Sequence, residues 1–433
     1  MHKLIERKIY DFYTNKFRFV YILFLLFVSI LSIIFTYHLL LKIPYLADEY
    51  NNVIISNIPF GYGPLIENLY NGNGYIKLWN GADNYLSRLP FLPIFETILL
   101  KFTLNIYLFL LIKNLIFFSI YFYFAYLYSN LQNRSHIWFL LLTSIIFCNF
   151  YNLTTNLNFM FADAYIGIWL PTIFLILNTE LKYQNLILGL MLFFLYLTKT
   201  TMFFPTLTIC ILYLFFEKNF SLTKRFIPLL FLIISIVMWG TFAFIKTGVF
   251  AYGSKISSDN QEALNIVMNK DFHKYYPKLS VDLIPRNKPS TVFESEWDNY
   301  EYYKKLNNEY IQNNKERFLK DTLLKIKFIF FNIRKDAIHP DIDGKNYNPI
   351  IISHLLNRII LIFSMLIAFY TIFKNLKLIR FEKTDFYFLG IFFSSILPHV
   401  IGWTTSKHLV GIFIICHLYI ILKLKKYPKF KNF

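Results

Sequence analysis

The sequence contains little charge for its length. Only 16% of its 433 residues are charged, whereas ordinary soluble domains have about 25%. Hydrophobic residues make up 56% of the chain. These proportions exclude an ordinary soluble domain and predict a polytopic membrane protein.

The sequence also lacks the common metal, redox and nucleotide motifs. Cys148, Cys210 and Cys416 lie in apolar stretches without C-x-x-C spacing, which indicates buried structural thiols. The glycine pairs at Gly61 and Gly72 lack the third glycine of a dinucleotide loop, and there is no Walker loop or H-E-x-x-H motif. No cofactor is therefore expected; a divalent metal is compatible with the chain but not indicated.

The net charge of +18 follows the gaps between apolar runs. Lysine and arginine concentrate in these short gaps, where the positive-inside rule places them in the cytoplasm. The charge thus reports topology, so we expect membrane lipids and no nucleic acid among the partners.

Stretches of about 20 apolar residues are long enough to cross the hydrocarbon layer. A scan on this basis predicts an all-α polytopic membrane protein with about ten transmembrane helices, at residues 19–41, 105–129, 136–151, 164–180, 185–201, 203–217, 226–246, 350–373, 385–401 and 408–423. We expect a bacterial cytoplasmic (inner) membrane, with both termini cytoplasmic.

Three parts follow from this topology. The first, 1–246, is a transmembrane catalytic module that includes a first outer loop, 42–104; the second, 247–349, is a modest extracytoplasmic segment; the third, 350–433, holds C-terminal transmembrane helices. Three finer predictions are an interfacial helix over 88–104, a short outer loop near 151–163, and an amphipathic helix from Glu294 to Phe331.

Three acidic residues stand at predicted membrane borders on the outer face. Asp48 and Glu49 are adjacent just past the first apolar span, and Asp163 begins a later apolar run. Neighbouring acids can raise one another's pKa, and an ionisable residue at the edge of a span indicates a site. The alternatives are two solvated loop carboxylates and, for Asp163, a helix N-cap.

Cations lie near the same borders. Arg88 is suited to bidentate phosphate binding. Lys199 ends a predicted span, and because a lysine deep in the bilayer costs roughly 2.5–3.5 kcal/mol, it should either reach water or bind an anion. Lys407 and His408 precede the last span and rank second as phosphate contacts.

The order of these pieces resembles the GT-C superfamily of membrane glycosyltransferases, family 39, which includes protein mannosyltransferases and aminoarabinose transferases. Members carry an acid pair, a segment like A-x-x-L-x-x-G-x-G-Y and an Arg-Pro-Pro-like stretch; this chain has Asp48-Glu49, IENLYNGNGY at 66–75 and RLPFLP at 88–93. The spacing departs from the family, whose acid pair sits where this chain has Ile58 and Pro59, so Glu67 or Asp83 is an alternative base.

The resemblance implies a GT-C-like helical bundle that moves a sugar, with inversion, from a polyprenyl-phosphate donor to an acceptor glycan, lipid or protein on the extracytoplasmic face. Asp48 would be the general base, Glu49 and Asp163 would orient the acceptor or tune the pKa of Asp48, and Arg88 and Lys199 would hold the phosphate. Further predicted substrate contacts are Tyr62, Glu67, Asp83, Lys407 and His408. The alternatives are a polysaccharide polymerase or ligase using diphosphate-linked donors, and a transporter or flippase.

Overall fold

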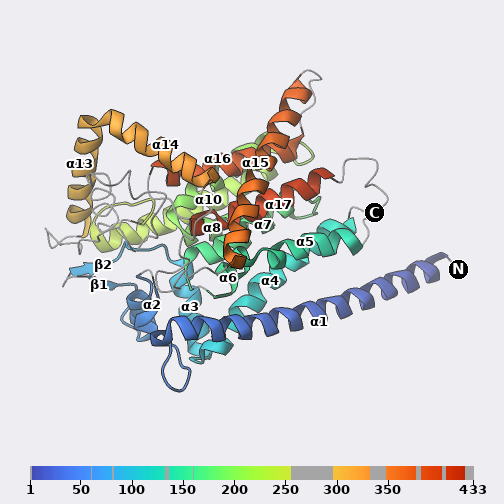
Figure 1. The fold of residues 1–433 in the computed structure, drawn as a ribbon, viewed down its shortest axis with the longest axis horizontal. Helices are drawn as coiled ribbons and strands as arrows, with labels where there is room; N and C mark the ends of the chain where they lie inside the picture. Colours follow the sequence, from blue (N-terminus) through green and yellow to red (C-terminus); the bar gives the residue numbers. More distant parts are fainter. Residues whose placement is uncertain are drawn as a thin grey trace.

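The fold is built almost entirely from helices (Figure 1). The computed structural model describes residues 2–59, 61–79, 82–131, 136–158, 160–254, 296–331, 348–376, 382–401 and 406–424. Within them, one two-stranded antiparallel hairpin joins β1 (Lys77–Trp79) to β2 (Ala82–Asn84), with Leu78 opposite Asp83. The predicted all-α class is confirmed.

From α3 to α10 the helices follow one another through short connections. Their bounds are α1 His2–Lys42, η1 Pro44–Leu46, η2 Ile55–Asn57, α2 Gly63–Tyr70, α3 Phe91–Phe102, α4 Ile106–Leu131, α5 His136–Cys148, α6 Phe150–Asn158, α7 Ala162–Leu177, α8 Gln184–Thr198, η3 Thr200–Met202, α9 Phe203–Phe216, α10 Leu222–Thr247, α13 Glu296–Asn313, α14 Lys315–Phe331, α15 Asn348–Leu376, α16 Lys383–Ile401, η5 Ser406–Leu409 and α17 Val410–Leu424.

Fewer helices than predicted are long enough to span a membrane. Among the described residues, four qualify by length and composition: Phe19–Leu41, Ile106–Ser129, Leu222–Thr247 and Ile352–Lys374. A fifth span would join α6 to α7, which are bent by 117°. The prediction of ten spans is therefore wrong, although each of the ten predicted stretches contains a helix.

Helix length explains this difference. Helices α5, α8, α9 and α17 have 13, 15, 14 and 15 residues. At about 1.5 Å per residue they cover roughly 20–23 Å, less than the hydrocarbon core of about 30 Å. The sequence scan counted apolar residues but could not see where each helix ends.

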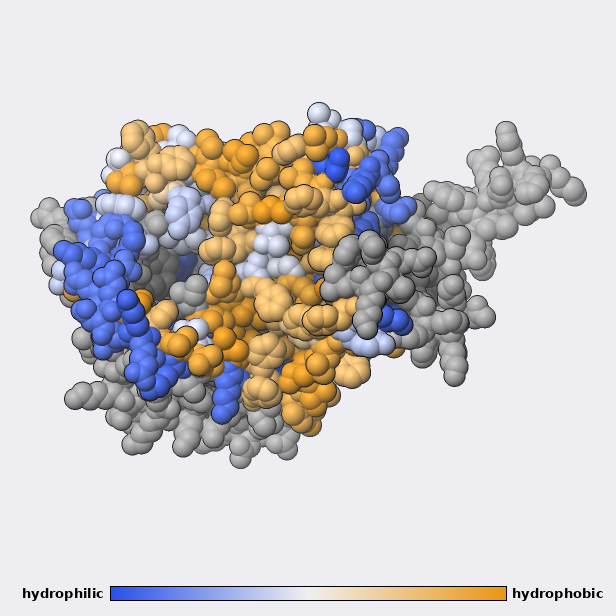
Figure 2. Space-filling model, turned by 90° about the horizontal axis from the view of Figure 1, so that it is seen from above, coloured by the Kyte–Doolittle hydropathy of each residue, from blue (hydrophilic) through white to orange (hydrophobic). Residues whose placement is uncertain are grey.

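The outer surface of the bundle supports a membrane location. Large apolar side chains are exposed along the candidate spans, including Leu26 and Ile30 of α1, Val237 of α10, and Phe363 and Leu366 of α15. Figure 2 shows a broad hydrophobic face, with hydrophilic residues gathered at the left, the end where α13 lies in Figure 1. Exposed apolar surface of this extent is typical of contact with lipid.

Helix α7 forms the centre of the bundle. All of its residues are buried, and it packs against α4, α8 and α17. A helix that is apolar on every side is expected at such a position. Small residues bring α7 close to α17, because a Cβ on Gly411 would lie 3.1 Å from the carbonyl oxygen of Ile166.

The predicted outer loop at 151–163 is wrong. Most of it belongs to α6, whose residues 151–157 are all buried. Helix α6 packs against α1, α7 and α15. Its polar sequence, FYNLTTNLN, is typical of a loop, and only tertiary packing reveals it as an interior helix.

The other helix predictions are largely confirmed. Helix α3 begins after Pro90, buries Leu99 and Leu100 and exposes Ile98 and Phe102, the two-sided pattern of an interfacial helix. The helix predicted from Glu294 to Phe331 is split at Asn314 into α13 and α14, since asparagine is a weak helix former. Residues 255–295 and 332–347 of the predicted outer segment lie outside the described residues.

The bundle has two distinct ends. The first residues of α1 and the last of α17 lie at one end, which we name the tail end (Figure 1). Residues 42–104 and α13 lie at the other, which we name the loop end. Helix α7 begins at the loop end with Ala162 and finishes at the tail end with Leu177.

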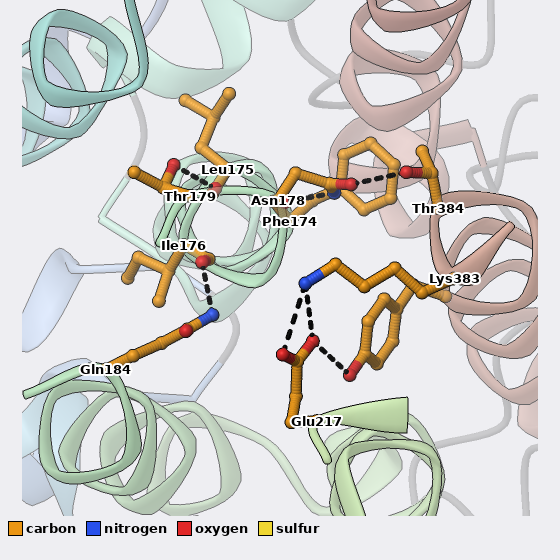
Figure 3. Close-up of polar contacts among 10 residues, drawn as sticks. Phe174, Leu175, Ile176, Asn178, Thr179, Gln184, Glu217, Lys383 and Thr384 are labelled. Carbon is orange, nitrogen blue, oxygen red and sulfur yellow. Dashed lines mark hydrogen bonds and ion pairs between the residues drawn. The ribbon is translucent and has the colours of Figure 1, made fainter. Parts of the chain in front are cut away.

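Side chains close off the last turn of α7 at the tail end (Figure 3). The last carbonyls of a helix have no partner within the helix and need one from elsewhere. Here they accept hydrogen bonds from three side chains: Asn178 Nδ2 donates to Phe174 O (2.8 Å), Thr179 Oγ1 to Leu175 O (2.7 Å), and Gln184 Nε2 to Ile176 O (2.8 Å).

A buried ion pair lies beside this turn (Figure 3). Lys383 Nζ donates to both carboxylate oxygens of Glu217, at 2.8 and 3.1 Å. Tyr387 OH donates to Glu217 Oε1 at 3.2 Å, and Thr384 Oγ1 donates to Asn178 Oδ1 at 2.7 Å. These bonds join α16 to the ends of α7 and α9, so this group is structural.

Candidate functional site

Asp163 lies in the first turn of α7 at the loop end. The N-cap is Phe161, in an extended conformation, so the N-cap interpretation of Asp163 is wrong. The carboxylate instead occupies the first turn, where the helix dipole favours negative charge. Its side chain is only 8% exposed, and a buried carboxylate requires partners.

Lys199 provides the closest partner. It is the C-cap of α8, with extended backbone angles of −158° and 132°, and its Nζ donates to Asp163 Oδ1 at 2.7 Å. The next residue, Thr200, stabilises this turn, because its hydroxyl forms a hydrogen bond of 2.7 Å with the hydroxyl of Ser254. Lys199 thus pairs with a carboxylate of the same protein, and its predicted contact with a donor phosphate stays a prediction.

Two histidines complete the group. His408 of η5 places Nε2 3.9 Å from Asp163 Oδ2. The ring of His399, from the end of α16, stacks on the ring of His408 with centroids 4.5 Å apart. We name Asp163, Lys199, His399 and His408 the Asp163 centre. It brings together the ends of four helical elements. Asp163 and His408, the members farthest apart in the sequence, are separated by 245 positions.

Residues 42–104 cover α7 close to this centre. Tyr165, two residues after Asp163, donates to Glu96 Oε1 of α3 at 2.7 Å. Burial raises the pKa of Glu96 to about 7, although the Tyr165 hydrogen bond and the charge of Lys113 act in the opposite direction. The loop and the start of α7 therefore form one packed unit.

Arg88 belongs to the same unit. Its guanidinium lies 5.2 Å from the centre of the Tyr62 ring, and Tyr62 is within electrostatic range of Tyr165. Gly61 adopts a left-handed φ of 74°, and a Cβ there would lie 3.0 Å from Lys77 Nζ and 3.7 Å from Arg88 Nη2. Two cations thus converge on this glycine, and the sequence analysis missed Lys77.

The acid pair lies elsewhere. Asp48 and Glu49 are exposed, in a turn between η1 and Val53. Asp48 Oδ1 accepts hydrogen bonds from the backbone N–H of Asn52 (2.7 Å) and Tyr50 (2.9 Å). The Asn52 N–H holds the pKa of Asp48 below its ordinary value, opposite to the increase expected for an acid pair. Among the described residues, no contact joins Asp48 to Asp163.

The remaining predicted contacts are dispersed. Glu67 is half-buried on α2, and Asp83 is exposed on β2. Lys407 lies in η5 beside His408, but its side chain is outside the described part of the chain. Within that part, no group of three His, Cys, Asp or Glu residues could hold a metal ion.

The structure brings together some of the predicted site residues but not Asp48 and Glu49. Asp163, Lys199 and His408 come together, and His399 joins them without having been predicted. A lone histidine in an apolar run, next to Pro398, was the signal available, because ionisable residues in spans are rare. A carboxylate held beside an ammonium can accept a proton from a hydroxyl while the cation faces an anionic leaving group.

Comparison with known proteins gives no further indication of family. No family model matches the chain, and no curated protein matches it.

Proposed function

We propose that this protein is an integral membrane glycosyltransferase that moves a sugar from a polyprenyl-phosphate donor to an acceptor hydroxyl at the Asp163 centre. The observation that carries the proposal is the buried Asp163–Lys199 pair at the loop end, 2.7 Å apart, with His408 beside the other carboxylate oxygen. The reaction would take place on the extracytoplasmic side of a bacterial inner membrane, which is then the side of the loop end.

The proposed reaction assigns a role to each charge. The acceptor oxygen attacks the anomeric carbon, the bond from that carbon to the phosphate oxygen breaks, and its electron pair leaves with the polyprenyl phosphate. Asp163 takes the acceptor proton, a contribution of about 10²–10⁴ in rate. Lys199 stabilises the departing phosphate, and inversion follows from the single displacement.

Asp163 has a better environment for the base than Asp48. It is buried, 8% exposed, so little water competes with an acceptor hydroxyl for it, whereas Asp48 is exposed and bound by its own turn. The role predicted for Asp48 and Glu49 stays a prediction, and the same assay tests it. Arg88, next to Tyr62, is proposed as a second contact to the donor phosphate.

The test is turnover by the purified full-length chain in liposomes. A panel of polyprenyl-phosphate sugars is supplied, and release of the free carrier is measured. Asp163→Asn should abolish release, whereas Glu309→Gln should retain it, because Glu309 forms only an exposed pair with Lys305 on α13. Equal turnover by both variants would reject the proposed site, and no turnover by the wild type with any donor would reject the function.

One observation favours a transporter or flippase as a second candidate. Helices α6 and α7 are bent by 117° at a short break, and Asp163 lies just after it. Broken helices with ionisable residues at the break are typical of transporters. Movement of labelled lipid across proteoliposomes without sugar transfer would support this candidate. A carrier released as diphosphate would instead indicate the polymerase or ligase reaction.

A further inference from the structure

Helix α6 carries an unusual polar face in the interior of the bundle. Asn152, Thr155 and Asn156 are at positions i, i+3 and i+4, so their side chains share one side of the helix. Asn152 and Thr155 are fully buried and Asn156 is 2% exposed. Within the described part of the chain, five side-chain atoms of these residues have no hydrogen-bond partner: Asn152 Nδ2 and Oδ1, Thr155 Oγ1, and Asn156 Nδ2 and Oδ1.

Several other polar groups in and beside the same helix form hydrogen bonds. Asn149 Oδ1 accepts from the backbone N–H of Asn152 at 3.2 Å, and Thr154 Oγ1 donates to Tyr151 O at 2.9 Å. Near the C-terminal end, Asn114 Nδ2 donates to Leu157 O at 3.1 Å. The five atoms of Asn152, Thr155 and Asn156 therefore gather on one face of a helix that forms hydrogen bonds elsewhere.

This face lies against the start of α7. A Cβ on Gly167 would overlap Asn156 Oδ1 and come within 2.8 Å of Val410 Cγ1. Gly167 is one helical turn after Asp163, and Val410 is two residues after His408. The polar face is thus next to the Asp163 centre, at a contact that only glycine permits without displacement.

Such a face is costly unless it binds something. Each buried polar group without a partner destabilises the fold, because it loses its hydrogen bonds to water and gains none in return. Amides and hydroxyls both donate and accept hydrogen bonds, as sugar hydroxyls do. The three side chains carry no charge, so their chemistry suits a neutral hydroxyl-bearing ring better than a phosphate.

We propose that Asn152, Thr155 and Asn156 form the subsite that binds the hydroxyl groups of the lipid-linked sugar. The inference rests on the proposed function, since it places the sugar of the donor against this face of α6. Lys199 then faces the phosphate, and Asp163 faces the attacking hydroxyl. This arrangement makes α6 the element that distinguishes a loaded carrier from a bare one.

Binding, measured without turnover, tests the subsite. The full-length chain in detergent is titrated with a short-chain polyprenyl phosphate, bare or carrying one neutral hexose or pentose from a panel. The wild type should bind at least one loaded lipid about tenfold or more tightly than the bare lipid. Asn152→Leu and Thr155→Val should lose this preference and keep the affinity for the bare lipid.

Thr154→Val is the matched control, because the hydroxyl of Thr154 is bound within its own helix; it should retain the preference. The melting temperature gives a second readout. Thr155→Val should leave it unchanged or raise it, since the change removes a buried polar atom without a partner. A fall in melting temperature together with an intact preference would show a structural role and overturn the subsite.

The results also separate the two proposals. A preference for a loaded lipid that is lost in the α6 variants, without any turnover, would support the subsite and reject the transferase. Turnover by the wild type with the preference intact in Asn152→Leu and Thr155→Val would support the transferase and reject the subsite. A wild type without preference for any panel sugar would also reject the subsite.

Discussion

The two ends of α7 hold buried charges in different ways. At the tail end, Glu217 accepts hydrogen bonds from both Lys383 and Tyr387. Side chains also cap the last carbonyls of α7. At the loop end, Asp163 meets Lys199 and His408, and a polar face without partners lies alongside. The comparison shows that side-chain bonds join several helices at one end, whereas the other end holds the residues of the proposed site.

A large effect should follow from removing the cation at the loop end. Lys199→Met should lower transfer by about 10²–10³-fold, because the departing phosphate loses its electrostatic partner. Lys199→Arg should recover part of the rate, since the charge returns with altered geometry. The measurement is carrier release per folded molecule. An unchanged rate for Lys199→Met would mean that the lysine at the loop end, like the one at the tail end, takes no part in transfer.

The matching change at the tail end should affect stability instead. Lys383→Met leaves Glu217, only 4% exposed, without its cation. The expected loss is about 3 kcal/mol of unfolding free energy, the low end for a buried pair, because Lys383 itself is 33% exposed.

Two further observations refine this prediction. Transfer per folded molecule should stay at the wild-type level in Lys383→Met. Adding Glu217→Leu should restore much of the stability, since an apolar pair can replace a buried ion pair. A chain that keeps its stability but loses transfer would assign the tail end a part in the reaction.

Glu96 should make stability depend on pH near neutrality. Its folded pKa of about 7 lies above the ordinary value of 4.5, so the folded state binds a proton that the unfolded state releases. The stabilisation is therefore complete below pH 4.5 and is lost as the pH rises through 7. Melting temperatures should fall over this range, and Glu96→Gln should flatten the profile.

Asp48 should give the smallest effect. Its folded pKa lies below 3.8, so its stabilisation is present above pH 3.8 and is lost as the pH falls through the folded value. Asp48→Ala removes the acceptor for the N–H groups of Tyr50 and Asn52 and should lower the melting temperature slightly. A large loss of stability would mean that this turn supports more of the fold than its contacts indicate.

Hydropathy predicted where the helices are but not how they cross the membrane. Apolar runs located the candidate spans within α1, α4, α10 and α15 to about four residues or better at each end, although α1 itself begins at His2. The break before Asp163 and the ends of the short helices depend on packing. A count of apolar residues gives no information about packing. Helix α6 was missed because a polar helix buried between other helices has the composition of a loop.

The candidate site was predictable as a set of residue types at membrane borders. Asp163, Lys199 and His408 stood out because charge near the end of a span is rare. Their pairing, and the addition of His399, required the folded arrangement of four helix ends. The exposure of Asp48 could not be predicted either, since nothing in the local sequence distinguishes a reactive carboxylate from one that binds its own turn.

The most direct test compares Asp163→Asn with Asp48→Asn in the carrier-release assay, using equal amounts of folded protein. The proposed site predicts that Asp163→Asn loses about 10²–10⁴ of the rate and that Asp48→Asn keeps most of it. A full rate in Asp163→Asn, with loss in Asp48→Asn, would contradict the account and move the base to the first outer loop.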